Sequence, residues 1–347
     1  MKKNLSYFLV GLVLIVGVST PVFGADFYEG KTIRFIVGFS PGGGYDTYTR
    51  AIARHIGKYI PGNPTPVVMN MTGAGSLIAA NYNANRAKPD GLTVAVWTPG
   101  IILGHALGDK KVRFDPRKLG WIGTPTTETI TCGIMGFTGL KTLDDIVKSG
   151  RTLTVPATRA PGNTTDPPKF LNRALGTKFK VVTGYRGTAR MRLALQSREA
   201  QVACWTWESM RVTARGMLDA EGDDKFIPFV IAKKWNDPEV KNLPLFNEVI
   251  KDKSTLALWK AFNTQNEITK AYSVAPGTPK DRLDILRKAF AATMKDPQFL
   301  ADAKKSKLNV THVTWQQVEK GVEEIHSLPP KLREELQVMA GLKKKKR

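Results

Sequence analysis

A short glycine-rich stretch, residues 37–46, has the most suggestive chemistry in the sequence. It reads VGFSPGGGYD and follows the apolar run KTIRFIV. Gly38 to Gly42 fit G-x-S-x-G, the turn that presents the nucleophilic serine of many hydrolases, so Ser40 is a candidate nucleophile. The glycines at 42–44 suit a different role, because consecutive glycines let backbone N–H groups approach an anion closely.

The residue after Ser40 argues against hydrolysis. The oxyanion hole of such a turn uses the backbone N–H of that residue, and Pro41 has none. Loss of one such donor slows a reaction by about 100-fold to 1000-fold. His312 and His326 lie downstream as candidate bases, but each also fits an ordinary polar histidine. The loop then either binds an anion or makes a plain tight turn, which is the better interpretation of an isolated motif, and a serine hydrolase is the third alternative.

Other catalytic and cofactor motifs are missing from the sequence. The stretch lacks both the Gly-Lys-Ser/Thr of a P-loop and the spacing of a dinucleotide-binding turn. C-x-x-C, H-E-x-x-H and a local group of histidines with acids are also missing, so neither a cofactor nor a metal is expected. Cys132 and Cys204 lie in apolar runs, which leaves open whether they form a disulfide or remain buried thiols.

The N-terminus has the layout of a secretory signal peptide. Lys2 and Lys3 precede an apolar stretch over residues 9–18, and small residues lead to Gly24. We expect residues 1–24 to be removed and the remaining chain to be periplasmic. Beyond this segment the sequence has no run of about 18 apolar residues that would predict a membrane span.

The chain is strongly basic, with a formal net charge of +22 at pH 7 and a terminal KKKKR. A positive field favours anionic partners. Nucleic acid is not expected among them, because an exported protein rarely meets it and the sequence has no zinc-finger, helix-turn-helix or RNP signature. The basic tail, residues 343–347, is expected to be a solvated end.

The segments around these residues alternate between β-rich runs and helical patterns. The sequence predicts strands over 32–39, 66–71, 92–98, 152–156, 178–183, 201–206 and 226–232. It predicts helices over 46–60, 76–88, 168–175, 188–196, 208–218 and 280–295. Strands joined by helices of this length indicate parallel βαβ units. Because the length suits two domains, we expect two α/β lobes with a cleft between them.

Glycine-rich or polar turns follow six of the predicted strands. They read SPGGGYD, TGAG and TPG in the first lobe, and RAPGNTT, GYRG and WTWES in the second. In open parallel sheets, ligands bind outside the carboxyl ends of the strands, where such turns and the starts of helices lie. We expect these six turns to face one another across the cleft.

Several longer stretches, taken in order, resemble one family. They are KTIRFIVGFSPGGGYDTYTRAIARHI, VVMNMTGAGSLIAANYNANRAKPDGLTVAVWTPG, VVTGYRG, LPLFNEV and APGTPKDRLDILRKAFAATMKDPQF. Together they are similar to the solute-binding proteins of tripartite tricarboxylate transporters, the Bug or TctC-like family. The resemblance covers nearly all of the chain after the signal peptide and its motifs are specific as a set.

The resemblance implies a two-lobed type II periplasmic binding protein fold, a Venus flytrap. Residues 25–126 and 265–347 would form lobe I, and residues 127–264 would form lobe II. It implies a monomeric protein that is not an enzyme. Such a protein would close on a dicarboxylate, a tricarboxylate or an aromatic carboxylate and deliver it to integral-membrane permease subunits.

The resemblance also implies the positions that contact the ligand. In lobe I they are Phe39, Ser40, Gly42, Gly43, Gly44, Asp46, Gly73, Ala74, Gly75, Trp97 and Thr98. In lobe II they are Pro161, Gly162, Asn163, Thr164, Thr165, Tyr185, Arg186 and Gly187, and the chemistry of the residues adds Arg159, Trp207 and Glu208 as candidates. Asp46 would cap a helix or hold a water, because like charges repel. Arg159 and Arg186 are candidate carboxylate partners, with solvated rim charges as the alternative.

Two segments depart from the family pattern. APGNTTDPPKF stands where the family has a loop closer to Pro-Gly-x-Gly-Ser, and VACWTWES stands in place of VDFMFD, which displaces the acid to Glu208. Both lie where the far end of a ligand would be recognised, so the exact carboxylate stays open. Trp97, Trp205 and Trp207 could form an aromatic slot for a larger carboxylate, or could pack at the lobe surface or hinge.

Overall fold

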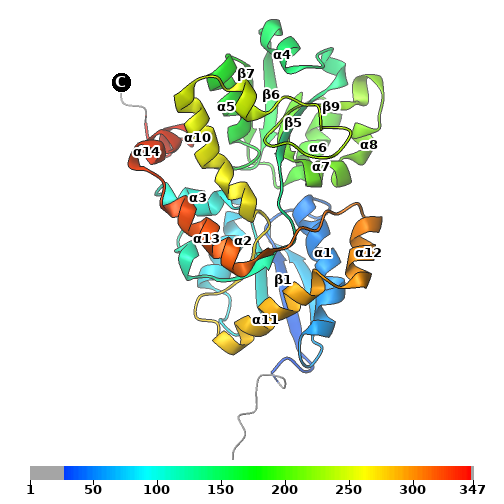
Figure 1. The fold of residues 1–347 in the computed structure, drawn as a ribbon, viewed down its shortest axis with the longest axis vertical. Coiled ribbons are helices and arrows are strands. Elements are labelled where there is room, and N and C mark those ends of the chain that lie inside the picture. The colour runs from blue at the N-terminus through cyan, green and yellow to red at the C-terminus, as the bar shows by residue number, and fades with distance from the viewer. Residues whose placement is uncertain (1–26, 345–347) are drawn as a thin grey trace, which may run out of the picture.

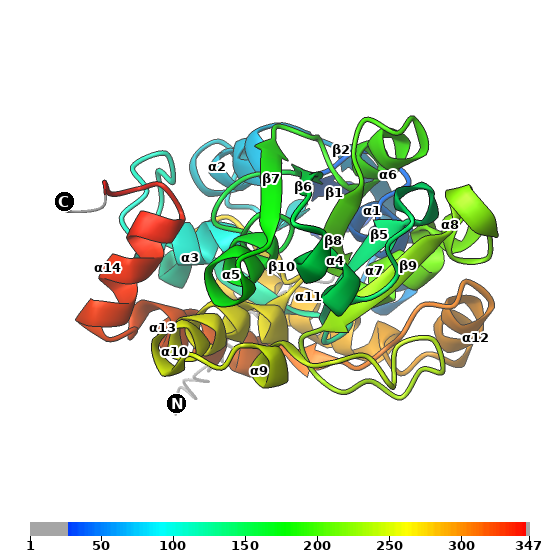
Figure 2. The same cartoon turned by 90° about the horizontal axis from the view of Figure 1, so that it is seen from above.

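The computed structural model describes residues 27–344, so the predicted signal peptide lies outside the described residues. The chain forms two lobes, one above the other in Figure 1, with α10 (Lys253–Asn263) and α13 (Trp315–His326) along one side. Figure 2 shows that α13 and α14 (Pro330–Met339) lie on the opposite side of the molecule from α8 (Arg215–Leu218) and α12 (Pro297–Lys305). Within residues 27–344, no helix is both long and apolar enough to span a membrane.

Lobe I is built on a six-stranded sheet with the order β11-β4-β10-β3-β1-β2. Its strands are β1 Thr32–Val37, β2 Thr65–Asn70, β3 Thr93–Val96, β4 Gly120–Thr124, β10 Tyr272–Val274 and β11 Val313–Thr314. β1 is parallel to both β2 and β3, as the βαβ pattern predicts. β10, where the chain returns to this lobe, pairs antiparallel with β3, and β11 pairs antiparallel with β4.

The helices of lobe I cover both faces of this sheet. They are α1 Gly44–Ile56, α2 Leu77–Asn85, α3 Gly100–Ala106, α11 Lys280–Thr293, α12, α13 and α14, with the short helices η1 Gly57–Tyr59, η2 Ala74–Ser76, η3 Pro116–Lys118 and η6 Thr264–Ile268. α1 shows how the sequence sets the packing. Tyr48, Ile52 and Ile56 recur at helical spacing, are each at most 2% exposed, and pack in one cluster with Phe35 of β1. Burial of each such side chain stabilises the fold by about 1.5–3 kcal/mol.

Lobe II contains a three-stranded sheet, β8-β5-β9, and a parallel pair, β6 and β7. Its strands are β5 Ile130–Met135, β6 Thr152–Ala157, β7 Lys178–Thr183, β8 Val202–Thr206 and β9 Phe226–Ile231. Its helices are α4 Leu143–Ser149, α5 Asp166–Leu175, α6 Thr188–Gln196, α7 Trp207–Thr213, α8, α9 Phe246–Val249 and α10, with η4 Gly136–Thr138 and η5 Gly222–Asp224.

β5 is not among the strands that the sequence predicts, and it departs from the parallel pattern of the predicted βαβ units. This strand pairs antiparallel with both β8 and β9. The reason is its connection: β5 brings the chain from lobe I, so it begins at the inter-lobe end, where β8 finishes. The predicted helix over 208–218 is also interrupted, because α7 ends before Ala214 and α8 starts after it.

Cys132 and Cys204 form a disulfide, which settles the alternative that the sequence left open. They occupy directly paired positions on β5 and β8, with their Cα atoms 4.1 Å apart. Both side chains are fully buried. The bond therefore links the strand that enters lobe II to the strand that runs back toward the cleft.

Candidate ligand-binding site

A cavity of about 50 Å³ lies between the two lobes. It is lined by Phe39, Gly43, Gly44, Tyr45, Thr98, Thr158, Asn163, Thr164, Thr188, Trp205, Thr206, Ser209, Thr269 and Lys270. This volume has room for only a few water molecules. The lobes are therefore closed on each other, and a larger ligand needs them to part.

Three helices begin at this cavity. Gly44 and Tyr45 are the first residues of α1, Thr188 is the first residue of α6, and Asn163 and Thr164 lie just before Thr165, the N-cap of α5. The first N–H groups of a helix have no partner within the helix and carry a partial positive charge. The starts of α1 and α6 at this small cavity favour an anionic ligand, whereas α5 offers no free N–H there, because the N–H of Asp166 donates to the carbonyl of Gly162 and Pro167 and Pro168 have none.

Several buried polar atoms of the lining have no hydrogen-bond partner among the described residues. They are Nε1 of Trp205, Oγ of Ser209 and Oδ1 of Asn163. An unpaired buried polar atom costs about 1–3 kcal/mol, so such atoms are rare unless a ligand or water pairs with them. Trp205 and Ser209 can both donate a hydrogen bond. They lie on lobe II, opposite residues 42–44 of lobe I, which we call the glycine loop.

The glycine loop lies directly against lobe II. A Cβ added to Gly44 would lie 2.2 Å from Oγ of Ser209, and one added to Gly43 would lie 3.1 Å from Oγ1 of Thr188. No ordinary side chain fits at Gly44 without displacing α7. Glycine at this position therefore permits the close approach of the two lobes.

Ser40 lies beside this loop but does not line the cavity. Its backbone N–H and its Oγ both donate to the carbonyl oxygen of Arg186, at 3.1 Å and 3.3 Å. His312 packs against Phe290, and His326 pairs with His105, so neither candidate base contacts Ser40. The serine thus contributes a contact between the lobes.

Asp46 fixes the glycine loop through hydrogen bonds to its carboxylate. Its carboxylate accepts hydrogen bonds from the N–H of Gly42 at 3.0 Å, from Arg50 at 3.0 Å and from Asn70 at 2.9 Å. Burial acts to raise its pKa, but these donors outweigh burial and the pKa lies below its usual value. The N-cap of α1 is Gly43, so Asp46 fixes the loop without being the cap.

Neither arginine proposed as a carboxylate partner lines the cavity. Arg159 donates from Nη2 to Oδ2 of Asp109 at 2.5 Å, and this ion pair joins the two lobes. The side chain of Arg186 is exposed to solvent. The cation that does line the cavity is Lys270.

Lys270 is 1% exposed and forms an ion pair with Glu128, which is equally buried. Its ammonium also lies 5.1 Å and 5.0 Å from the ring centres of Tyr45 and Tyr48. Burial lowers the pKa of Lys270 well below its usual value. No local pattern in the sequence indicates this residue, which lies two positions before the start of β10.

Trp207 and Glu208 are displaced from the cavity by the start of α7. Trp207 is fully buried and donates from Nε1 to Asp237 at 3.1 Å. Glu208 accepts the N–H of Thr129 at 3.1 Å, and burial raises its pKa to about 8. Because the chain turns into the helix at Trp207, the neighbouring residues Trp205, Thr206 and Ser209 reach the cavity instead.

Of the positions implied by the family resemblance, the structure brings six to the cavity lining: Phe39, Gly43, Gly44, Thr98, Asn163 and Thr164.

Trp97 packs in the core against Trp121, with ring centres 5.5 Å apart. Gly75 and Gly187 lie at lobe contacts, against Arg159 and Ser40. The other positions outside the lining are Gly42, Gly73, Ala74, Pro161, Gly162, Thr165 and Tyr185. Trp205, one of the three tryptophans considered for an aromatic slot, lies in the lining. Sequence reasoning missed the other lining residues: Tyr45, Thr158, Thr188, Thr206, Ser209, Thr269 and Lys270.

Known proteins resemble this chain in both sequence and fold. No family model matches it. Protein BugT of Bordetella pertussis is 38% identical over 82 residues, a match that spans 24% of this chain and 24% of BugT. The periplasmic binding protein BugD aligns over 91% of this chain and 99% of its own, with a TM-score of 0.70 and 21% identity. MatC from Rhodopseudomonas palustris, solved with bound malate, aligns over 88% of this chain and 99% of its own, with a TM-score of 0.69 and 21% identity. This chain therefore resembles the Bug and TctC solute-binding proteins, as its motifs imply, and shares their two-lobed periplasmic binding fold.

Proposed function

We propose that this protein is a periplasmic solute-binding protein that captures a small carboxylate between its lobes. The observation that carries the proposal is the pair of unpartnered buried donors, Nε1 of Trp205 and Oγ of Ser209, at a cavity where α1 and α6 begin. An ionised carboxylate only accepts hydrogen bonds, so it complements this set of donors.

The charges around the cavity support an anionic ligand. Lys270 in the lining is paired with Glu128, and Asp46, which accepts the N–H of Gly42, is paired with Arg50, so each acid beside the cavity is balanced by a cation. The N–H groups at the start of α1 would donate to a carboxylate group at one end of the ligand. Trp205 and Ser209 would donate to acceptors at the other end of the ligand. This arrangement suits a ligand with acceptors at both ends, such as a dicarboxylate.

Closure of the two lobes would trap the ligand. Contacts already join the closed lobes, namely Ser40 to Arg186, Arg192 to the carbonyl of Gly42 at 3.2 Å, and Arg159 to Asp109. A bound carboxylate that bridges the lobes would add to these contacts and favour the closed state over the open one.

Delivery to a membrane transporter completes the proposal. Support comes from the signal-peptide layout of residues 1–24 and from the resemblance to the tripartite tricarboxylate transporter proteins. MatC, which shares the fold, holds malate, so a C4 dicarboxylate is the first ligand to try. The permease subunits would recognise the closed, loaded form. The proposed role is binding, without catalysis.

A thermal-shift screen tests the binding proposal. The panel contains malate, other dicarboxylates, tricarboxylates and aromatic carboxylates, each paired with its neutral amide. A ligand that binds only the folded state adds about 2.7 kcal/mol of stability at 100 times its Kd, so Tm should rise steadily with ligand concentration. We expect at least one carboxylate to raise Tm while its amide does not. If no carboxylate stabilises the protein, the proposal is wrong.

A further inference from the structure

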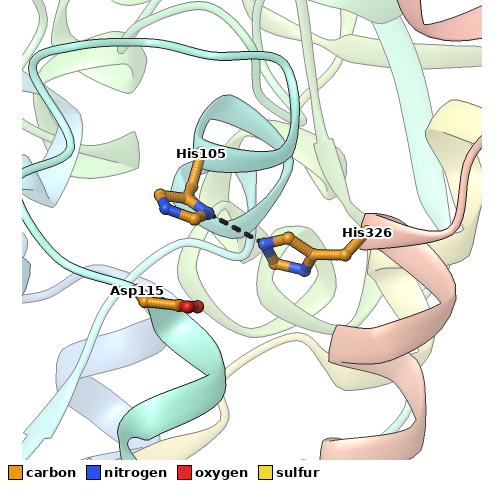
Figure 3. A group of neighbouring side chains, drawn as sticks. All are labelled: His105, Asp115 and His326. Carbon is orange, nitrogen blue, oxygen red and sulfur yellow. Dashed lines mark hydrogen bonds between the residues drawn. The ribbon is translucent and has the colours of Figure 1, made fainter. Parts of the chain in front are cut away.

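Two of the four histidines in the sequence meet on lobe I, away from the ligand cavity. His105 lies in the last turn of α3, and His326 is the final residue of α13 (Figure 3). Nδ1 of His105 and Nε2 of His326 are 2.9 Å apart, although 221 residues separate them in the chain. Asp115, the N-cap of η3, offers a carboxylate oxygen within 4.8 Å of ring nitrogens of both.

The ring of His326 is already oriented by its second nitrogen. Nδ1 lies 2.7 Å from the carbonyl oxygen of Val322, and a carbonyl can only accept, so Nδ1 carries the hydrogen. In the neutral ring, the lone pair is then on Nε2, the atom that faces His105. A histidine that binds a metal usually donates its other N–H to a carbonyl or carboxylate in this way.

We propose that His105, His326 and Asp115 form a binding site for a divalent transition-metal ion of the Zn²⁺ class. Two imidazole nitrogens and one carboxylate oxygen are ligands that Zn²⁺ accepts at about 2.0–2.2 Å, with water completing the tetrahedron. Two nitrogens at that distance in a tetrahedral site lie about 3.4 Å apart. The side chains therefore need to separate by roughly half an ångström, and His105 would shift its hydrogen from Nδ1 to Nε2.

Arg117 competes for the same carboxylate. Its guanidinium donates to both oxygens of Asp115, from Nε at 2.9 Å and from Nη2 at 2.7 Å. The Arg117 side chain is 45% exposed, so it is free to swing into solvent when a metal takes the carboxylate. Asp115 is the main cause of the raised pKa of Arg117, and Glu323, three residues before His326 on α13, adds a smaller contribution, so Glu323 is near enough to receive the guanidinium. Removal of this arginine should therefore strengthen metal binding.

The spacing of residues along the sequence could not indicate this metal site. The prediction of no metal site rested on the lack of a local motif, and these three residues come from three separate elements. A bound ion would tie α3 to α13. α13 also packs on η6, the segment immediately before the cavity residues Thr269 and Lys270.

Isothermal titration of the untagged protein with ZnCl₂ tests the proposal. We expect one bound ion per chain. His105→Gln and His326→Gln should each weaken binding by at least about tenfold, a loss that follows even from changes to residues that support the ligands. Asp115→Asn, which keeps the η3 cap, should also weaken it, whereas Arg117→Gln should tighten it.

His312→Gln is the control, because His312 is a half-buried histidine that packs on Phe290 away from this cluster. It should bind Zn²⁺ as the wild type does. Thermal unfolding in EDTA shows whether each variant folds. The proposal is overturned if the wild type binds no Zn²⁺, or if binding survives in both histidine variants. Carboxylate binding is measured separately in metal-free buffer, so this result is independent of the proposed transport function.

Discussion

Lys270 and Glu128 form a buried ion pair where the two crossings between the lobes meet. Residues 125–129 lead from β4 into β5, and residues 264–271 lead from α10 back to β10. Thr269 lies between them: its Oγ1 donates to Glu128 at 3.1 Å, and its carbonyl accepts from Thr124. The pair therefore fixes one crossing to the other at the edge of the ligand cavity.

Removal of one partner of this ion pair should destabilise the protein more than removal of both partners. Glu128→Gln leaves the ammonium of Lys270 buried without its counter-charge, which should lower the free energy of unfolding by about 3–5 kcal/mol. The double variant Glu128→Gln/Lys270→Met has no buried charge and should recover most of that loss. Urea denaturation measures both. Equal destabilisation of the single and double variants would contradict this account of the pair.

Glu208 should make the protein less stable as pH rises. Burial raises the pKa of its carboxyl to about 8, from an ordinary value of 4.5. The folded state therefore keeps a proton that the unfolded state releases, and the stability from this group is full below about pH 4.5 and is lost as pH rises to about 8.

The variant Glu208→Gln retains an acceptor for the N–H of Thr129 and does not titrate. The unfolding free energy of the wild type minus that of the variant should fall with pH, by up to about 1.4 kcal/mol per pH unit between pH 5 and pH 8. Urea unfolding at several pH values measures this difference. A difference that does not change with pH would show that Glu208 is ionised in the folded state.

Substitution at Gly44 should impair ligand capture more than substitution at Ser40. Gly44→Ala places a methyl group 2.2 Å from Oγ of Ser209 and opposes closure, so carboxylate affinity should fall by more than about tenfold. Ser40→Ala removes one hydrogen bond between the lobes and should cost about 0.5–1.5 kcal/mol at most.

The matched control is Gly216→Ala, because an added Cβ there meets nothing within 4 Å. Titration calorimetry with the strongest ligand from the screen compares the three variants. If Gly44→Ala binds like Gly216→Ala, the glycine loop does not govern closure.

The two tryptophans of the WTWES turn should behave differently. Trp205→Phe keeps an aromatic ring but removes the unpartnered donor at the cavity, so affinity should fall by about 10-fold or more, as for a hydrogen bond to a charged group. Trp207→Phe removes the bond to Asp237 and should lower stability with little change in affinity. Calorimetry and thermal unfolding separate the two effects, and equal losses of affinity would argue against the assigned donor.

The sequence predicted the fold well wherever a local pattern determines it. The bounds of β7 and α6 match the predicted residues, and α1 buries the face that its spacing indicates. The direction of β5 was not predictable in the same way, because it depends on the connection from lobe I rather than on any property of residues 130–135.

The candidate site was predictable only in part, for a related reason. Gly43 and Gly44 follow a strand and precede a helix, and that local context places them at the cavity. Lys270 reaches the same cavity from the far end of the chain, which no local pattern indicates. Of the tryptophans considered for an aromatic slot, Trp205 lines the cavity and Trp207 does not, because α7 begins at Trp207, a boundary that sequence alone does not determine.

The central claim is that a carboxylate binds between the glycine loop and the unpartnered donors of lobe II. The most direct measurement is a crystal structure of the protein grown with the strongest carboxylate from the screen. We predict that the ligand lies between α1 and α7 and accepts hydrogen bonds from Nε1 of Trp205 and Oγ of Ser209, at about 2.7–3.2 Å. A ligand bound elsewhere, or in this cavity with both donors still unpaired, would contradict the claim.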